Sequence, residues 1–242
     1  MFLTNLYNTI LFEPVFNLLM FLYQLMPAHD MGLAVILLTM IVKALLLPID
    51  MKALRSQKAL QEMQPKIDEI QKKYKDDKEE QAKQTMLIFQ ESKINPFFGI
   101  WALFIQIPIL IAIYQVLTQL SAAVKNGQSI AIAKFYPFVH QPEVINYLFL
   151  GIIDLSKPAL WMAIIVGILQ FIQIKMTMGK TPKTKDSQSV MQQSMAYFSP
   201  IFLAIVLTAL PAVIGVYFLA TSIWTIAQQQ IIQKKKESHD GQ

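Results

Sequence analysis

The 242-residue chain contains no cysteine and only three histidines. The lack of cysteine excludes structural disulfides, thiolate metal sites and thiol catalysis, and we expect no lipid-modified cysteine at the N-terminus. The histidines at positions 29, 140 and 239 are far apart and lack the spacing of metal ligands, so no metal site is expected. Residues 1–28 carry no Lys or Arg, and we therefore expect no secretory signal peptide, which would open with basic residues.

Enzyme motifs are also missing. The apolar stretches hold no paired carboxylates, and the chain has neither a phosphate-cradling glycine loop nor a His-Glu metalloprotease motif. Lys43 is conceivable as a Schiff-base or general-base lysine, but the sequence offers it no partner group. We predict a protein that is not an enzyme and that uses no cofactor.

Apolar sequence is what the chain has in excess: 54% of its residues are hydrophobic, and the mean hydropathy is +0.42. This composition is too apolar for a soluble domain and typical of a small multi-span membrane protein. A membrane-crossing helix needs about 20 apolar residues. We predict an all-α polytopic fold with five transmembrane helices, at residues 31–51, 96–120, 158–178, 195–210 and 211–232.

The last two predicted spans come from one apolar block, residues 195–232, which is too long for a single crossing. Pro211 lies near its middle, and proline disfavours helix at the residue before it. We interpret Leu210–Pro211 as a turn between two spans; a single kinked helix is the alternative.

The N-terminal segment is ambiguous by hydropathy. Residues 3–26 are long enough to span, but Glu13-Pro14 and several amides interrupt them, so an amphipathic helix in the membrane interface fits as well. The count of basic residues decides between these, because Lys and Arg concentrate in cytoplasmic connections. Residues 52–95 hold ten and residues 121–157 hold three, so the first connection is cytoplasmic. If residues 3–26 also spanned, the N-terminus would lie inside without a basic residue nearby; we therefore predict 1–28 as an extracytoplasmic interfacial helix, with the N-terminus outside.

The same count places the remaining connections. Residues 121–157 are predicted outside, and the connections 52–95 and 179–194 are predicted in the cytoplasm together with the basic tail 233–242.

The first cytoplasmic connection reads as a helical hairpin. Asp76-Asp77 is the expected turn, and Pro65 is expected to kink or break the first helix. Near-equal numbers of both charges argue against direct nucleic-acid binding. We predict a docking arm for a partner, with a solvated connector as the alternative. The predicted docking residues follow a heptad spacing: Leu60, Met63, Ile67, Ile70 and Tyr74.

Lys43 is the only ionisable residue inside the first span before its cytoplasmic end, which it precedes by about 12 Å. A charge at that depth costs a few kcal/mol or more and usually faces protein or water. Snorkelling to the headgroups is the alternative, but a lysine stem reaches only about half that depth. Thr39 and Asp50 lie roughly on the same helical face.

The cytoplasmic halves of other predicted spans also carry polar residues. Each alone is compatible with ordinary helix–helix hydrogen bonding. Together they predict a water-filled, positively charged groove that is open to the cytoplasm and closed towards the outside, where the spans are almost purely hydrocarbon. The predicted groove residues are Lys43, Thr39, Gln106, Gln170, Gln173, Thr221 and Thr225.

Four segments carry a family resemblance: GLAVILLTMIVKALLLPIDMKALRSQKALQEMQPKIDEIQKKY (32–74), INPFFGIWALFIQIPILIAIY (94–114), FIQIKMTM (171–178) and SPIFLAIVLTALPAVIGVYFLATSIWTIAQQQII (199–232). Their order is a span, a hairpin with an internal Gln-Pro, an Asn-Pro entry to the next span, and a closing segment ending in paired glutamines. Over essentially the whole chain this arrangement resembles the YidC/Oxa/Alb family of membrane protein insertases, in its five-span bacterial form. In that form the N-terminal helix lies on the outer membrane face.

The resemblance implies an insertase that accepts nascent hydrophobic segments with their polar flanks and releases them into the bilayer without nucleotide hydrolysis. The family's intramembrane basic residue, usually arginine, corresponds to Lys43, and its groove glutamine to Gln170 or Gln173. Phe218 stands where the family often has tryptophan, and we add it to the predicted groove. Lysine lacks the planar fork of arginine, which puts bidentate capture of a carboxylate in doubt.

The resemblance also implies a location and partners. The location is the bacterial cytoplasmic membrane, and the partners are nascent membrane proteins and the phospholipid bilayer; the Sec translocon, the ribosome and the signal recognition particle pathway are further candidates. The alternative from another class is a small anion transporter or channel with Lys43 in its pathway. That alternative predicts polar residues in the outer halves of the spans as well.

Overall fold

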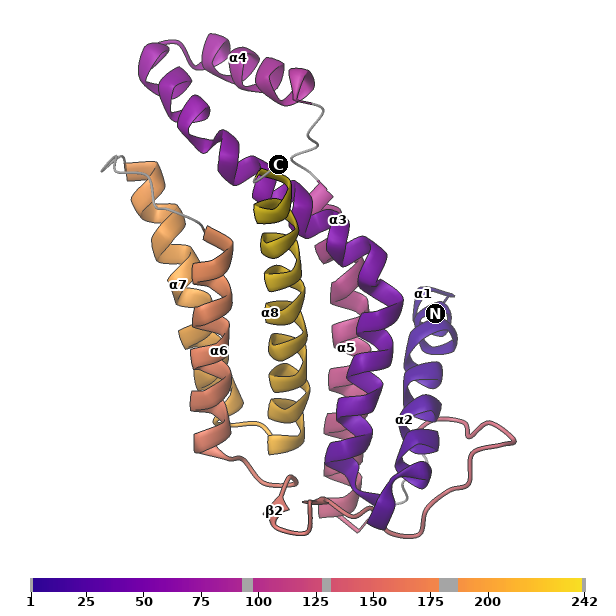
Figure 1. Ribbon diagram of the computed structural model, residues 1–242. Coiled ribbons are helices and arrows are strands. Elements are labelled where there is room, and N and C mark those ends of the chain that lie inside the picture. Colours follow the sequence, from indigo (N-terminus) through magenta and orange to yellow (C-terminus); the bar gives the residue numbers. More distant parts are fainter. Residues whose placement is uncertain (1, 93–97, 128–131, 179–186, 241–242) are drawn as a thin grey trace.

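The computed structural model describes residues 2–92, 98–127, 132–178 and 187–240 as a bundle of helices with one short strand pair (Figure 1). Part of the predicted connection 179–194 and the last two residues of the predicted tail lie outside these ranges. The elements are α1 (Phe2–Tyr7), the π-helix η1 (Asn8–Phe12), α2 (Glu13–Leu25), the 3-10 helix η2 (Pro27–His29), α3 (Met31–Lys73), α4 (Lys78–Glu91), α5 (Phe98–Lys125), β1 (Leu148–Phe149), β2 (Ile153–Asp154), α6 (Leu160–Met178), α7 (Ser187–Leu207) and α8 (Ala212–Asp240).

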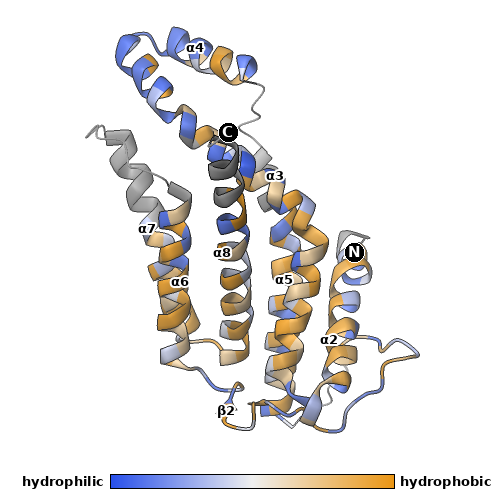
Figure 2. Ribbon diagram, in the orientation of Figure 1, coloured by the Kyte–Doolittle hydropathy of each residue, from blue (hydrophilic) through white to orange (hydrophobic). Residues whose placement is uncertain are grey.

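Four helical segments of the described chain are long and apolar enough to cross a bilayer: Thr4–Leu25, Met31–Leu60, Phe104–Lys125 and Ala212–Ile232. Shorter apolar stretches lie in α6 and α7. Figure 2 shows hydrophobic residues along the bundle and mostly hydrophilic ones in the projecting part of the molecule. A mostly helical fold with several apolar helices was predicted and is present. The predicted number of five spans is not confirmed, because the described apolar stretches of α6 and α7 are shorter, at Leu160–Met176 and Tyr197–Leu207.

α3 is the longest element, with 43 residues and therefore a length of about 65 Å. Its N-terminus is capped by Asp30, whose carboxylate accepts a hydrogen bond from the Leu33 amide. Pro65 was expected to kink or break the first helix; a break is contradicted, since α3 contains this proline and continues to Lys73. Proline removes one amide donor and displaces one carbonyl, and Pro65 is exposed, so water can bind the displaced carbonyl.

The end of α3 and the following helix form a projection that we call the arm, residues 61–91. The chain turns at residues 74–77, and α4 then begins with Asp77 as its N-cap. α4 runs back beside the end of α3 (Figure 1), and the Gln81 side-chain amide donates to the Gln71 carbonyl. The arm lies beyond one end of the bundle, which we call the arm end.

The opposite end of the bundle is covered by residues 132–159, and we call it the loop end (Figure 1). α7 stops at Leu207 and α8 starts at Ala212, so the described chain has two helices rather than one across Pro211. The amide of Ala212 donates to the Lys157 carbonyl, and that of Val213 to the Leu155 carbonyl. These bonds tie the start of α8 to the loop end.

The N-terminal segment was predicted to be an interfacial helix, and its position in the membrane stays a prediction. It packs lengthwise against α3 and α5, as a helix of the bundle (Figure 1). The polar residues that argued against this position are satisfied within the protein. Asn17 is buried, donates to the carbonyls of Glu13 and Lys134, and accepts from the Tyr136 amide at 2.7 Å. Tyr7 donates to Gln115 on α5. A buried amide with all its partners costs little, and hydropathy counts it only as polar.

A continuous apolar core fills the loop-end half of the bundle. It takes the first turns of α3, α6 and α8, the C-terminal half of α5, and most of α2. We call it the outer core. Its largest fully buried side chains are Phe16, Leu19, Met20, Tyr23, Met31, Val35, Leu38, Ile113, Leu117, Leu120, Leu155 and Ile214. In a membrane bundle such side chains stabilise the fold through close van der Waals packing between helices.

The loop end is bound to α3 at its first turn. Besides capping α3, Asp30 accepts a hydrogen bond from the Leu150 amide at 2.6 Å. Two residues further along the chain, Gly32 packs closely on Phe149: a Cβ added to this glycine would lie 2.8 Å from the ring Cγ. Glycine at this position therefore lets the loop approach the helix backbone.

Candidate functional site

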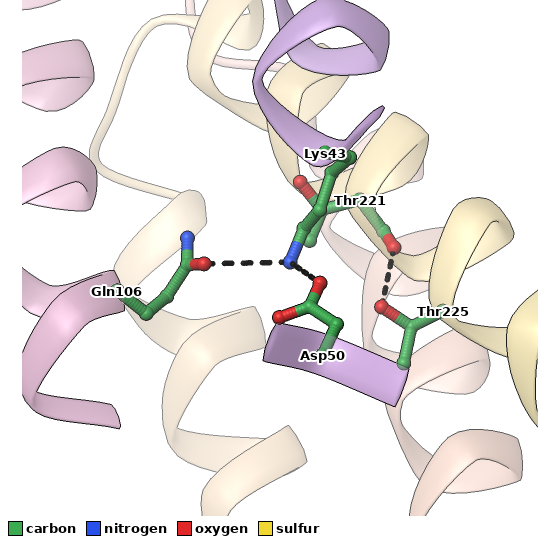
Figure 3. Close-up of polar contacts among 5 residues, drawn as sticks. All are labelled: Lys43, Asp50, Gln106, Thr221 and Thr225. Atoms are coloured by element: carbon green, nitrogen blue, oxygen red, sulfur yellow. Dashed lines mark hydrogen bonds and ion pairs between the residues drawn. The ribbon is translucent and has the colours of Figure 1, made fainter. Parts of the chain in front are cut away.

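Lys43 is the centre of the site and comes from the middle of the membrane-length part of α3. Its Nζ lies 3.3 Å from Asp50 Oδ2 and 3.5 Å from Gln106 Oε1 on α5 (Figure 3). Only 9% of its side chain is exposed. The ammonium is thus held between helices by two oxygen acceptors.

These acceptors border a cavity of about 530 Å³ formed by α3, α5, α6 and α8. The cavity lies in the arm-end half of the bundle, next to the outer core. On α8, core residues run from Ala212 to Tyr217, and cavity residues run from Tyr217 to Gln228. α5 shows the same division in reverse order, because it is antiparallel to α8. The lining residues are Lys43, Asp50, Ala53, Leu54, Ser56, Gln57, Leu60, Gln106, Leu110, Gln170, Gln173, Tyr217, Phe218, Thr221, Thr225 and Gln228.

Most predicted groove residues come together in this cavity. Seven of the eight line it, and both candidates for the groove glutamine, Gln170 and Gln173, are among them. Thr39 is the exception: it is buried and its hydroxyl donates to the Val35 carbonyl at 2.7 Å. Thr39 has the helical face of Lys43 but lies one turn deeper, at the level of the outer core. The helical period indicates which face of α3 carries Thr39, but it does not indicate at which depth in the bundle the cavity ends.

The groove was predicted to be positively charged because of Lys43, and in the structure Asp50 lies beside this lysine. Its carboxylate forms an ion pair with Lys43, with 19% of its side chain exposed. Lys43 and Asp50 are the only charged residues in the described lining, so the formal charges of the cavity sum to zero. The sequence placed Asp50 on the face of Lys43, but lysine and aspartate seven residues apart are about 10 Å apart along a helix. The Lys43 side chain must therefore extend along the helix towards Asp50 to form the ion pair.

The wall on α8 and α6 presents uncharged polar groups. Gln170 donates to the Ser222 hydroxyl at 3.2 Å, and Ser222 in turn donates to the Phe218 carbonyl. Thr225 donates to the Thr221 carbonyl (Figure 3). Among the described residues, the buried side-chain nitrogen of Gln228 has no hydrogen-bond partner. A buried donor of this kind costs about 1–3 kcal/mol unless water or another polar group binds it.

The predicted docking residues, Leu60 just before the arm and four residues within it, are buried or half-buried. Leu60 lines the cavity, and Ile67 is buried. The other three, Met63, Ile70 and Tyr74, are half-buried. The exposed large apolar side chains of the arm are instead Met86 and Leu87 on α4. Docking through the original set remains a prediction, and the heptad pattern is also accounted for by packing within the protein.

Metal chemistry has no ligand set in the described residues, where no group of three His, Asp or Glu side chains lies close enough to hold an ion. The cavity offers instead one ammonium, one carboxylate and several amides and hydroxyls beside apolar side chains such as Leu110 and Phe218. Such a surface can bind a segment with both polar and apolar parts.

Comparison with known proteins gives a consistent result. The model of a family described as "60Kd inner membrane protein" matches residues 21–239. The chain is 32% identical over 209 residues to a "Membrane protein insertase YidC" of Oceanobacillus iheyensis, which covers 84% of this chain and 74% of that protein. A protein of the same description from Clostridium tetani is 27% identical over 89% of this chain and 87% of its own length.

Longer relatives are matched over one part only. The protein of the same description from Brucella melitensis biotype 1 is 30% identical over 93% of this chain, which spans 35% of that protein's length. Because the family model matches most of the residues, the chain belongs to the 60Kd inner membrane protein family, the YidC/Oxa1 family.

Proposed function

We propose that this chain is a membrane protein insertase that receives the polar flank of a nascent hydrophobic segment in the cavity around Lys43 and releases the segment into the bilayer. The observation that carries this proposal is the buried ammonium of Lys43, enclosed with amides and hydroxyls in one half of a membrane bundle. The names of the relatives, all membrane protein insertases, support it.

The physical difficulty of insertion is the polar flank. An unsatisfied polar group in an apolar medium costs several kcal/mol, and an isolated charge costs far more. The cavity replaces water with fixed donors and acceptors: the Lys43 ammonium, the amide of Gln106 and the hydroxyls of Thr221 and Thr225. The unpartnered amide of Gln228 supports a hydrated lining.

The hydrophobic part of the segment supplies the driving force. It moves into lipid with a gain of roughly 25 cal/mol per Å² of apolar area removed from water. A segment of ordinary length thereby offsets the transfer of a short flank, so the proposed reaction needs no nucleotide. Clients are nascent membrane proteins, and the bilayer is the acceptor.

The outer core supports an insertase over a channel. A transporter or channel for anions needs polar groups along its whole path, and the described outer core has large apolar side chains such as Leu38 and Leu117 there. The cavity is therefore proposed to open at one end only. Anion conductance of the purified protein in liposomes would revive the channel alternative.

The proposed orientation places the arm and α8's C-terminal end in the cytoplasm and the loop end outside, from the count of basic residues. In this proposal α3, α5, α6, α7 and α8 are the five crossing helices. α2 lies beside them with its C-terminal end outside.

Single cysteines test this orientation, because the chain itself has no cysteine. The variant Lys72→Cys, on the arm, should react with a membrane-impermeant maleimide only from the cytoplasmic side. The variant Glu143→Cys should react only from outside.

Partner binding through the arm is proposed as a separate role. Met86 and Leu87 are its exposed apolar residues, and they are candidates for contact with the Sec translocon, the ribosome or the signal recognition particle pathway. Loss of insertion on deletion of residues 61–91 would assign this role to the arm; unchanged insertion would leave the cavity as the working part.

Insertion by the purified protein tests the proposed function. Full-length protein in liposomes should insert a short single-span substrate with an acidic flank in the absence of nucleotide, measured as protease protection of the translocated flank. Protein-free liposomes and liposomes containing the Lys43→Glu variant are the controls. Equal protection in wild-type and protein-free liposomes would contradict the proposal.

A further inference from the structure

The ion pair inside the cavity has a consequence for substrate selection. Lys43 is the single cation of the described lining, and Asp50 holds it at 3.3 Å. An acidic flank that approaches this cavity therefore meets a pair with no net formal charge. Attraction by Lys43 and repulsion by Asp50 act on the flank at nearly the same place.

The geometry leaves Lys43 able to bind a third acceptor. A lysine ammonium has three N–H donors, and the described contacts use two of them, on Asp50 and Gln106. A substrate carboxylate on the third donor would lie within about 4–6 Å of the Asp50 carboxylate, because both would contact one nitrogen. At such distances inside a protein, like charges repel strongly enough to change binding several-fold or more.

The position of Asp50 on α3 adds to this effect. Asp50 lies seven residues nearer the arm end than Lys43, which is about 10 Å along the helix, and the lysine side chain brings its ammonium to within 3.3 Å of that carboxylate. A flank that enters from the arm end, as the proposed function requires, therefore meets both charges together and cannot reach the ammonium without passing close to Asp50.

We propose that Asp50 is the residue that sets the charge selectivity of insertion, as an internal anion competing with substrate carboxylates for Lys43. This inference rests on the proposed function and deepens it. Asp50 weakens the preference for acidic flanks that Lys43 alone would give and allows neutral and basic flanks to use the same cavity. It acts through Lys43 and is a positioning residue for that ammonium as well.

The test is a substrate panel with full-length protein in liposomes. Three single-span substrates differ only in flank charge: acidic, neutral and basic. Asp50→Asn keeps the size of the side chain and an oxygen that can accept from Lys43, so the cavity is expected to keep its shape. Initial insertion of the acidic substrate should rise about threefold to tenfold, the neutral one should stay within about twofold, and the basic one should fall.

The matched control is Asp68→Asn. Asp68 is on the same helix, outside the cavity, and accepts from Gln64 at 3.0 Å. Its substitution changes the net charge of the protein by the same amount and should leave the ratio between the three substrates unchanged.

A second pair of variants covers the case in which Asp50→Asn lowers the yield of folded protein. Lys43→Gln leaves Asp50 as an uncompensated carboxylate in the cavity, and Lys43→Gln with Asp50→Asn removes that charge. The double variant should insert the acidic substrate at least about threefold faster than Lys43→Gln. An equal rate would overturn the proposal.

The remaining outcomes are also decisive. An equal change for all three substrates in Asp50→Asn, or a fall for the acidic one alone, would overturn the selectivity role. Failure of the proposed function looks different, because wild type would then insert none of the three substrates above protein-free liposomes, and the selectivity role would fall with it.

Discussion

Replacing Lys43 with glutamate should reduce insertion of an acidic-flanked substrate by at least about tenfold. The change removes the single cation of the described cavity lining and adds a second carboxylate near Asp50. In the wild type, Asp50 lies 3.3 Å from the Lys43 ammonium. The formal charge of the lining falls from zero to minus two. Both carboxylates would then repel the flank, and the only charged donor that could offset its desolvation is gone.

A graded series separates charge from size at this position. Lys43→Arg keeps the charge and should retain most insertion, Lys43→Gln should be intermediate, and Lys43→Glu should be the weakest. Initial rates of protease protection in liposomes measure the series, with a neutral-flanked substrate as the internal control. If Lys43→Glu inserted the acidic substrate as well as wild type, the electrostatic part of the mechanism would be wrong.

The second large effect is expected at Gly32, where the loop end meets α3. Gly32→Val should lower the free energy of unfolding by about 3 kcal/mol, as overpacking does at close contacts. Even a single Cβ at this position would lie 2.8 Å from Phe149 Cγ and 2.9 Å from Leu155 Cδ1. Leu155 is fully buried and Phe149 is half-buried against the core, so we expect the loop to lift from the helix.

The sign of the smaller change Gly32→Ala makes this a sharp test. In an uncrowded helix, alanine is more favourable than glycine by about 1 kcal/mol. Here Gly32→Ala should destabilise the protein, whereas in a Phe149→Ala background the same change should be neutral or stabilising. Thermal unfolding in detergent measures both. Gly167→Ala is a milder comparison, since its Cβ would meet Ala204 Cβ at 3.1 Å. A stabilising Gly32→Ala in the wild-type background would contradict the predicted packing.

The polar half of the bundle was predictable because it follows from residue type and helical period. Lys43, Gln106 and Thr225 interrupt apolar stretches at depths that can be counted from the ends of the predicted spans. Polar residues inside apolar spans usually face protein or a water-filled cavity. In the structure all three line the same cavity. The family resemblance added Phe218, which no pattern in the residues would have selected.

Features that depend on tertiary contacts were not predictable. Asn17 reads as a break in an apolar helix, yet its partners are backbone groups more than a hundred residues away, at Lys134 and Tyr136. The pairing of Lys43 with Asp50 depends on the conformation of the lysine side chain, which the helical period does not determine. The inward position of Leu60 depends on where α3 leaves the bundle.

The central claim is that the cavity holds the polar flank of a client, and site-specific photo-crosslinking tests it most directly. A photoreactive residue is placed at Gln106 or Thr225, which line the cavity, or at Ile205, an exposed apolar position on α7. A nascent chain is stalled with its polar flank at the membrane. The flank should crosslink to positions 106 and 225 and not to 205. Crosslinks of the flank to 205 alone, with none to the cavity, would contradict the account.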